Sequence, residues 1–151
     1  MNEFKSIDDI LDFAINSEQE AIDFYTKLAT VAKTDAIKEV FTDFAGEEAG
    51  HKAKLIEIKK NGSFGVITEK ISDLKIADYV VNNQPSPEMT YQDALILAMH
   101  KEKAAFKLYS ALADRAPNAD IRNLFLMLAQ EESKHKLRFE LEYDEYVLRE
   151  N

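Results

Sequence analysis

The sequence contains no cysteine and no tryptophan, and it has only four glycines and three prolines among 151 residues. Without cysteine the chain has no disulfide, no thiolate nucleophile, no iron–sulfur cluster and no cysteine-ligated metal site. The scarcity of glycine and proline, together with abundant alanine, leucine, isoleucine, glutamate and lysine, favours a mostly helical protein. This length is sufficient for one hydrophobic core, so we expect residues 1–151 to form a single all-α domain.

Positive charge is also scarce, because 28 acidic side chains outnumber 19 basic ones and leave a net charge of −9. This excess disfavours binding to nucleic acid and to anionic lipid, and it makes cations the natural partners. The uncharged runs are too short to cross a bilayer, and the N-terminal residues lack the apolar segment of a signal peptide. We therefore expect a cytoplasmic protein with no nucleic-acid or membrane partner.

One short motif occurs twice in the sequence. Glu48-Ala-Gly-His51 is followed 84 residues later by Glu132-Ser-Lys-His135. Four further residues repeat in pairs at the same offset, and they are Glu18 with Glu102 and Tyr25 with Tyr109. A single Glu-x-x-His is a weak signal for metal binding, but the repeat places two of the three histidines in one frame.

The repeat also predicts the architecture. Apolar residues recur every three or four positions over residues 7–60 and again over 90–147, which indicates two copies of one helical hairpin. In each copy the lone glutamate precedes the Glu-x-x-His by 30 residues, a spacing that brings these residues level on two antiparallel helices. Residues 61–89 are long enough to cross from one hairpin to the other, with a short helix expected within 71–81. The sequence thus predicts a four-helix bundle.

The repeated acidic residues lie in line with the apolar stripes of their helices. A carboxylate that is buried without a partner costs several kcal/mol or more. Four carboxylates carry a charge of −4, which two divalent ions neutralise, and a bridging oxide or hydroxide offsets the charge gained when both ions are oxidised. The predicted metal ligands are Glu18, Glu48, His51, Glu102, Glu132 and His135. Oxygen and imidazole ligands without thiolate favour iron, with manganese as an alternative, over a structural zinc.

Other polar residues lie on or near the same helical stripes. Tyr25 and Tyr109 each follow a ligand glutamate by seven residues, so they are either hydrogen-bond partners of the ligands or simple packing residues. His100 lies off its helix stripe and is expected to be exposed. Three more glutamates that lie off the ligand stripes are interpreted as surface charges, namely Glu20, Glu47 and Glu131.

With these motifs the chain resembles the ferritin-like superfamily, and within it the rubrerythrin branch of di-iron carboxylate proteins. The segments 18–25 and 102–109 are similar to the first and third helices of that family. The two Glu-x-x-His motifs are similar to its second and fourth helices. This resemblance covers both hairpins and implies a ferritin-like bundle that holds two irons, with Glu48 and Glu132 as bridging ligands.

The resemblance also implies an activity, the reduction of hydrogen peroxide to water by a di-iron oxidoreductase that protects against oxidative stress, usually as a homodimer. Rubrerythrins carry a cysteine-ligated rubredoxin domain that supplies electrons, whereas this sequence has no cysteine. The resemblance therefore implies a separate electron-donor protein. It also implies an extra glutamate one turn after the third-helix ligand, where this chain has Ala105.

Two alternative functions remain open from the sequence. The first is a ferroxidase or iron-handling protein that uses dioxygen in place of peroxide. The second is a non-redox metal-binding bundle, in which the ions only offset the charge of the buried carboxylates. Metal analysis followed by a redox titration distinguishes these alternatives from a peroxide-reducing enzyme.

Overall fold

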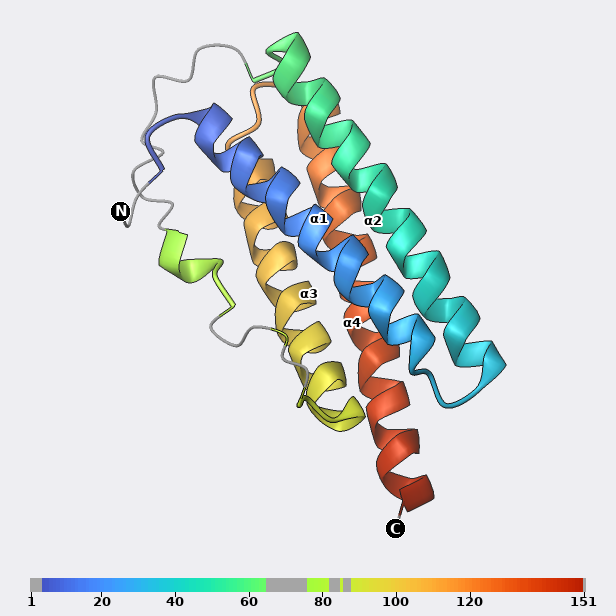
Figure 1. The fold of residues 1–151 in the computed structure, drawn as a ribbon. Coiled ribbons are helices and arrows are strands. Elements are labelled where there is room, and N and C mark those ends of the chain that lie inside the picture. The colour runs from blue at the N-terminus through green and yellow to red at the C-terminus, as the bar shows by residue number, and fades with distance from the viewer. Residues whose placement is uncertain (1–3, 65–75, 82–84, 86–87, 151) are drawn as a thin grey trace.

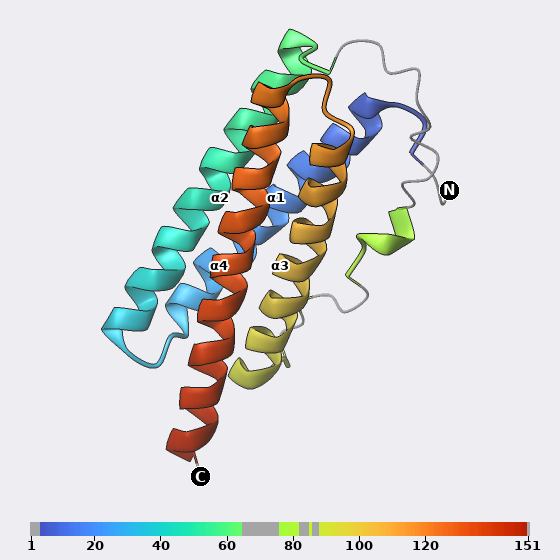
Figure 2. The same cartoon turned by 180° about the vertical axis from the view of Figure 1, so that it is seen from behind.

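The computed structural model describes residues 4–64, 76–81, 85 and 88–150. Four long helices form the molecule: α1 (Ile7–Thr30), α2 (Asp35–Asn61), α3 (Tyr91–Asp114) and α4 (Ala119–Glu150). Figures 1 and 2 show α1 and α2 as one antiparallel hairpin that packs against a second hairpin formed by α3 and α4. The predicted all-α four-helix bundle is confirmed.

Local sequence signals set the helix boundaries. Each helix begins next to a side chain that accepts a hydrogen bond from a backbone N–H in the first turn, which would otherwise be unpaired. These capping side chains belong to Ser6, Thr34, Thr90 and Asn118. At the end of α2, Gly62 adopts the left-handed conformation with φ of 61°, and its N–H bonds to the last turn of the helix.

The hydrophobic core consists of two clusters with a polar layer between them. One cluster contains the start of α1, the end of α2, the end of α3 and the start of α4, and the other contains the opposite ends of the four helices. Along every helix the predicted ligand residues fall between the segments that contribute to the two clusters. The apolar clusters therefore hold the polar layer in the interior from both sides.

The connection between the hairpins is described only in part. A 3₁₀ helix, η1 (Ile76–Asp78), lies within the segment 71–81 for which a short helix was predicted, and residues 71–75 lie outside the described residues. After η1, the Tyr79 ring packs against Phe4 with a centroid separation of 6.4 Å. This contact attaches the connection to the core cluster at the start of α1.

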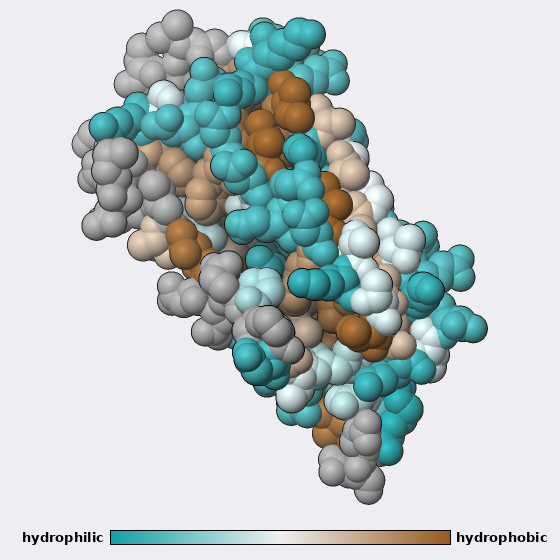
Figure 3. Space-filling model, viewed as in Figure 1, coloured by the Kyte–Doolittle hydropathy of each residue, from teal (hydrophilic) through white to brown (hydrophobic). Residues whose placement is uncertain are grey.

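The surface is largely polar on the face that carries α1 and α2. Figure 3 shows hydrophilic residues over most of this face, with hydrophobic residues in separate patches. None of the helices in the described part of the chain combines the length and hydrophobicity needed to span a bilayer.

Apart from the predicted ligands, one more buried carboxylate is present among the described residues, in the last third of α4. Glu142 is 1% exposed, although Ile58 occupies the matching position in the first hairpin. Its Oε2 accepts a hydrogen bond of 2.8 Å from the Tyr91 hydroxyl and lies 3.3 Å from the Arg149 guanidinium. Burial, followed by the bond to Glu142, raises the pKa of Tyr91, which keeps the phenol protonated as a donor.

Replacing Tyr91 with Phe should destabilise the protein by about 1 to 3 kcal/mol, because it removes a donor from a buried charged acceptor. Chemical denaturation of the natural protein and the variant measures this difference. Tyr143→Phe is the matched control, since the Tyr143 hydroxyl only accepts a bond from Gln92 in an exposed position. Equal effects of the two substitutions would show that the Glu142 contact has no special energetic role.

Candidate metal centre

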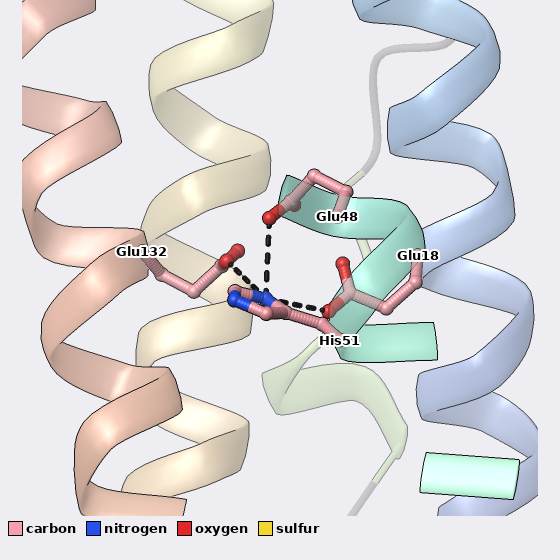
Figure 4. A group of neighbouring side chains, drawn as sticks. All are labelled: Glu18, Glu48, His51 and Glu132. Atoms are coloured by element: carbon pink, nitrogen blue, oxygen red, sulfur yellow. Dashed lines mark hydrogen bonds and ion pairs between the residues drawn. The ribbon is translucent and has the colours of Figure 1, made fainter. Parts of the chain in front are cut away.

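The six predicted ligand side chains converge on one region inside the bundle. Each of the four helices contributes: α1 and α3 carry one glutamate each, and α2 and α4 carry one Glu-x-x-His each. All six side chains are buried, with exposed fractions of 1–3%. Figure 4 shows Glu18, Glu48, His51 and Glu132 pointing toward one another from three helices.

These residues form two overlapping groups that could each hold a metal ion. The first group consists of Glu18, Glu48, His51 and Glu132, and the second consists of Glu48, Glu102, Glu132 and His135. Within each group the donor atoms lie within 4.8 Å of one another. Because Glu48 and Glu132 belong to both groups, the arrangement suits two adjacent ions that share these carboxylates.

The distances within the first group fit ligation of a single ion. His51 Nδ1 lies 3.2 Å from Glu18, 3.3 Å from Glu48 and 3.0 Å from Glu132. Two ligand atoms that each lie about 2.1 Å from one ion, at tetrahedral or octahedral angles, are separated by about 3.0 to 3.4 Å. The carboxylate oxygens and the imidazole nitrogen therefore surround a position of the right size for an ion.

The second group is slightly wider. His135 Nδ1 lies 3.6 Å from Glu48 Oε1 and 3.6 Å from Glu102 Oε1. Its ring also stacks on Phe44, with centroids 4.0 Å apart and an interplanar angle of 24°. The repeat does not give His51 an equivalent aromatic partner, because Leu128 occupies the position in the second hairpin that corresponds to Phe44. The two halves of the site are thus related by the repeat but are not identical.

Several atoms of the site remain without a hydrogen bond. In the part of the chain that the structure describes, the buried atoms with no such partner include both oxygens of Glu48, one oxygen each of Glu102 and Glu132, and both ring nitrogens of His135. An unpaired buried polar atom is costly, and a carboxylate more so. Bound cations would satisfy these lone pairs, so the residues present fit a pair of metal ions.

The two predicted tyrosines contact the ligand carboxylates across the bundle. The Tyr25 hydroxyl on α1 donates to Glu102 on α3, and the Tyr109 hydroxyl on α3 donates to Glu18 on α1 at 2.5 Å. Burial and the neighbouring carboxylates raise the pKa of both phenols well above the usual value, so both remain donors. Both tyrosines therefore hydrogen-bond to glutamates of the candidate site, and their role as partners of metal ligands stays a prediction.

The interpretation of Glu131 as a simple surface charge is wrong, whereas Glu47 is exposed as expected, although it also faces a histidine. Glu131 Oε2 lies 2.6 Å from His51 Nε2, and Glu47 Oε1 lies 3.5 Å from His135 Nε2. Each glutamate precedes a ligand glutamate and approaches the histidine of the opposite hairpin. The signal was present in the sequence, since this pair repeats at the same 84-residue offset as the ligands. Glu47 and Glu131, the outer glutamates, lie off the ligand stripes of their helices, so their side chains face Nε2 of the histidines, the ring nitrogen on the side away from the ligand carboxylates.

The hydrogen bond to Glu131 orients the His51 imidazole. When the imidazole is neutral, as a metal ligand must be, a carboxylate at Nε2 favours the tautomer with its proton on that nitrogen, and the Nδ1 lone pair then faces the interior. His135 lacks such a hydrogen bond, since Glu47 lies 3.5 Å from its Nε2 and is 47% exposed, whereas Glu131 is only 32% exposed. His100 and Glu20 are exposed, as expected for residues outside the site.

Without metal, the site retains protons. Burial and the charge of Glu48 raise the pKa of Glu18 to about 8, and burial with the charges of Glu102 and Glu48 raises that of Glu132. Burial alone would lower the pKa of His51, but its contacts with Glu18 and Glu48 outweigh burial and raise it to about 11. The pKa of His135 is raised in the same way, mainly through Glu102. Protons thus partly replace the positive charge that metal ions would supply.

Comparison with known proteins places the chain in a family. The Rubrerythrin family model matches residues 9–143. A solved structure described as a candidate ferritin-like diiron-carboxylate protein from Thermotoga maritima has a TM-score of 0.77 and 21% identity, covering 97% of this chain and 99% of its own. A hypothetical protein from Pyrococcus furiosus has a TM-score of 0.72 and 24% identity, with coverages of 93% and 89%. No curated protein matches the chain.

The fold and the buried carboxylate and imidazole cluster define a ferritin-like bundle with a possible metal site. The chain belongs to the Rubrerythrin family. The resemblance noted from the sequence is therefore confirmed.

The raised pKa values predict how pH affects the metal-free protein. The Glu18 carboxyl has a pKa of about 8 in the folded protein, compared with 4.5 in the unfolded chain. The His51 imidazole has a pKa of about 11 in the folded protein, compared with 6.5 in the unfolded chain. The folded state thus binds more protons, so this contribution to stability is complete below pH 4.5 and is lost as the pH rises toward 11. Metal binding displaces these protons, so its stabilising effect should grow with pH.

As the pH rises from about 6 to about 9, we expect the melting temperature of the chelated protein to decrease. The difference in melting temperature between the metal-loaded and the chelated protein should increase over the same range. Differential scanning calorimetry of both forms measures this. Glu18→Gln removes one of the site groups whose pKa is raised and should make the pH dependence of the chelated form less steep. A chelated protein that becomes more stable over this range would contradict the pKa assignments.

The outer glutamates predict unequal effects on metal affinity. Glu131→Gln should weaken binding at the His51 group by about 10-fold to 100-fold, because the imidazole loses the carboxylate that orients it. Glu47→Gln is the matched variant in the other hairpin and should have a smaller effect, given the longer contact and greater exposure. Competition titration with a metal-binding dye measures both affinities. Equal losses would show that the difference between the two contacts has no consequence for binding.

Proposed function

We propose that the six buried side chains bind two iron ions and that the protein reduces hydrogen peroxide to water with electrons from a separate donor protein. One observation supports this proposal most strongly. Two ligand groups, each with three carboxylates and one imidazole, share Glu48 and Glu132 in the interior of the bundle. Membership of the Rubrerythrin family supports the same assignment.

Each ligand has a distinct place in the proposed centre. Glu18 and Glu102 each belong to one group and would be terminal ligands, whereas Glu48 and Glu132 would bridge the two ions. The imidazoles would bind through Nδ1, the nitrogen that faces the carboxylates. When bound, the two irons supply two electrons and act as Lewis acids toward the substrate oxygens.

The surrounding side chains support this role. The phenols of Tyr25 and Tyr109 fix the carboxylates of Glu102 and Glu18 and remain protonated, so they hold the terminal ligands in a defined orientation. Four carboxylates match the charge of two divalent ions. Oxygen and imidazole ligands without thiolate favour iron, and also accommodate manganese.

Anaerobic mixing of the diferrous protein with hydrogen peroxide tests the proposal. We expect oxidation of about two irons per peroxide consumed, because cleavage of the O–O bond takes two electrons. Stopped-flow absorbance follows the oxidation, and a peroxide assay gives the stoichiometry. The same reduced protein mixed with dioxygen should react more slowly.

A variant of one shared ligand provides the control. Glu48→Gln preserves the shape of the side chain but removes a charge that both ions require, so the iron content should fall well below two per chain and peroxide consumption should cease. Slow reaction with peroxide and fast reaction with dioxygen would instead favour the ferroxidase alternative. A site that holds zinc and shows no spectral change with dithionite or peroxide would favour the non-redox alternative.

A further inference from the structure

A cavity of about 340 Å³ lies between α1 and α3 and reaches the candidate metal centre. Its inner end is formed by the carboxylates of the four ligand glutamates and by the rings of Tyr25 and Tyr109. Its side walls contain apolar residues from both helices and from the segment after η1. Asn16, Ser17, Glu20 and Lys101 supply polar groups to the lining and connect it to the surface.

Alanines account for the open space between the two helices. Ala14 and Ala21 on α1 and Ala104 and Ala105 on α3 all line the cavity. Larger side chains at these positions would fill the gap between α1 and α3, as side chains do between well-packed helices. Ala105 follows the ligand Glu102 by one helical turn, so its methyl group lies in the wall directly beside the metal ligands.

The cavity is much larger than hydrogen peroxide requires. A water molecule occupies about 30 Å³ in the liquid, and peroxide has only one oxygen more. Cavities that bind organic molecules start at about 300 Å³ and have apolar walls with a few polar groups at one end. The observed cavity has this character, since Phe13, Val80 and Leu108 line it together with the alanines.

We propose that this cavity binds the organic part of a hydroperoxide with a compact apolar group, and that the protein reduces such hydroperoxides in addition to hydrogen peroxide. This inference rests on the proposed function of the same site. The –OOH group points to the carboxylate-lined inner end, and the apolar group packs against the alanines and Leu108. Burial of the apolar group in this cavity favours the complex, because apolar surface is removed from water.

The reaction balances with the components already named. The O–O bond of the hydroperoxide breaks and takes up two electrons and two protons, which gives one alcohol and one water. The metal pair, held by the six candidate ligands, would supply the two electrons, and the proposed donor protein would restore them. The two protons come from solvent, and the lining residues nearest to it include the exposed Glu20 and the half-buried Ser17 and Lys101.

Consumption of two hydroperoxides by wild-type and variant protein tests the inference. We expect the natural protein to reduce both hydrogen peroxide and cumene hydroperoxide. Ala105→Leu should lower kcat/KM for cumene hydroperoxide about tenfold more than kcat/KM for hydrogen peroxide, because the added carbons occupy the space of the organic group. Ala36→Leu, at an exposed position of α2, is the matched control and should change neither value.

A binding measurement supplies a readout that does not depend on turnover. Cumyl alcohol has the shape of the expected product and is not reduced. Titrated into the protein as purified, it should bind saturably by calorimetry and shift the NMR signals of the alanine methyl groups in the cavity. Ala105→Leu should abolish this binding. Ala104→Leu, in the same wall, serves as the second variant if Ala105→Leu does not fold.

The outcomes separate this inference from the proposed function. Reduction of hydrogen peroxide without reduction of cumene hydroperoxide, or without binding of cumyl alcohol, overturns the inference and leaves the proposed function standing. Equal losses for both substrates in Ala105→Leu also overturn it, because the cavity would then be only a common access route. Failure to reduce either substrate contradicts the proposed function itself.

Discussion

The structure depends on the burial of four carboxylates and two imidazoles between two apolar clusters. Charged groups in such surroundings are unstable unless an opposite charge is present. Protons on Glu18 and His51 provide part of that charge in the metal-free protein, and two divalent ions would provide all of it. The bundle can therefore be understood as a framework that holds acidic side chains in place for cations.

The contacts around this layer extend from one hairpin to the other. Each tyrosine bonds to a carboxylate on the facing helix, and each outer glutamate approaches the histidine of the opposite hairpin. Because the contacts cross between hairpins, they fix the packing of one repeat against the other as well as the orientations of the candidate ligands. The repeat nevertheless departs from symmetry, since the contact at His51 is shorter than that at His135 and only the latter stacks on an aromatic ring.

Most of this arrangement could be predicted from the sequence, because the buried carboxylates interrupt the regular spacing of apolar residues along each helix. Glu18 and Glu102 occupy positions where apolar residues are expected, and the repeat shows that the exception is systematic. The contact of Glu131 with His51 was not predicted. The position of a residue around its own helix can be read from the sequence, but the side chains of the neighbouring helix that it meets cannot. The cavity was not predictable either. Ala105 was identified only as a missing glutamate, and the space beside it depends on how closely α1 and α3 approach.

The central claim is that this buried layer takes up two cations, and anomalous scattering from crystals of the purified protein tests it most directly. The account predicts two anomalous peaks at the iron edge in each chain, one inside each ligand group, with Glu48 and Glu132 between them. Crystals of iron-supplied protein that show no such peaks, with the six side chains held together by protons and water alone, would contradict it.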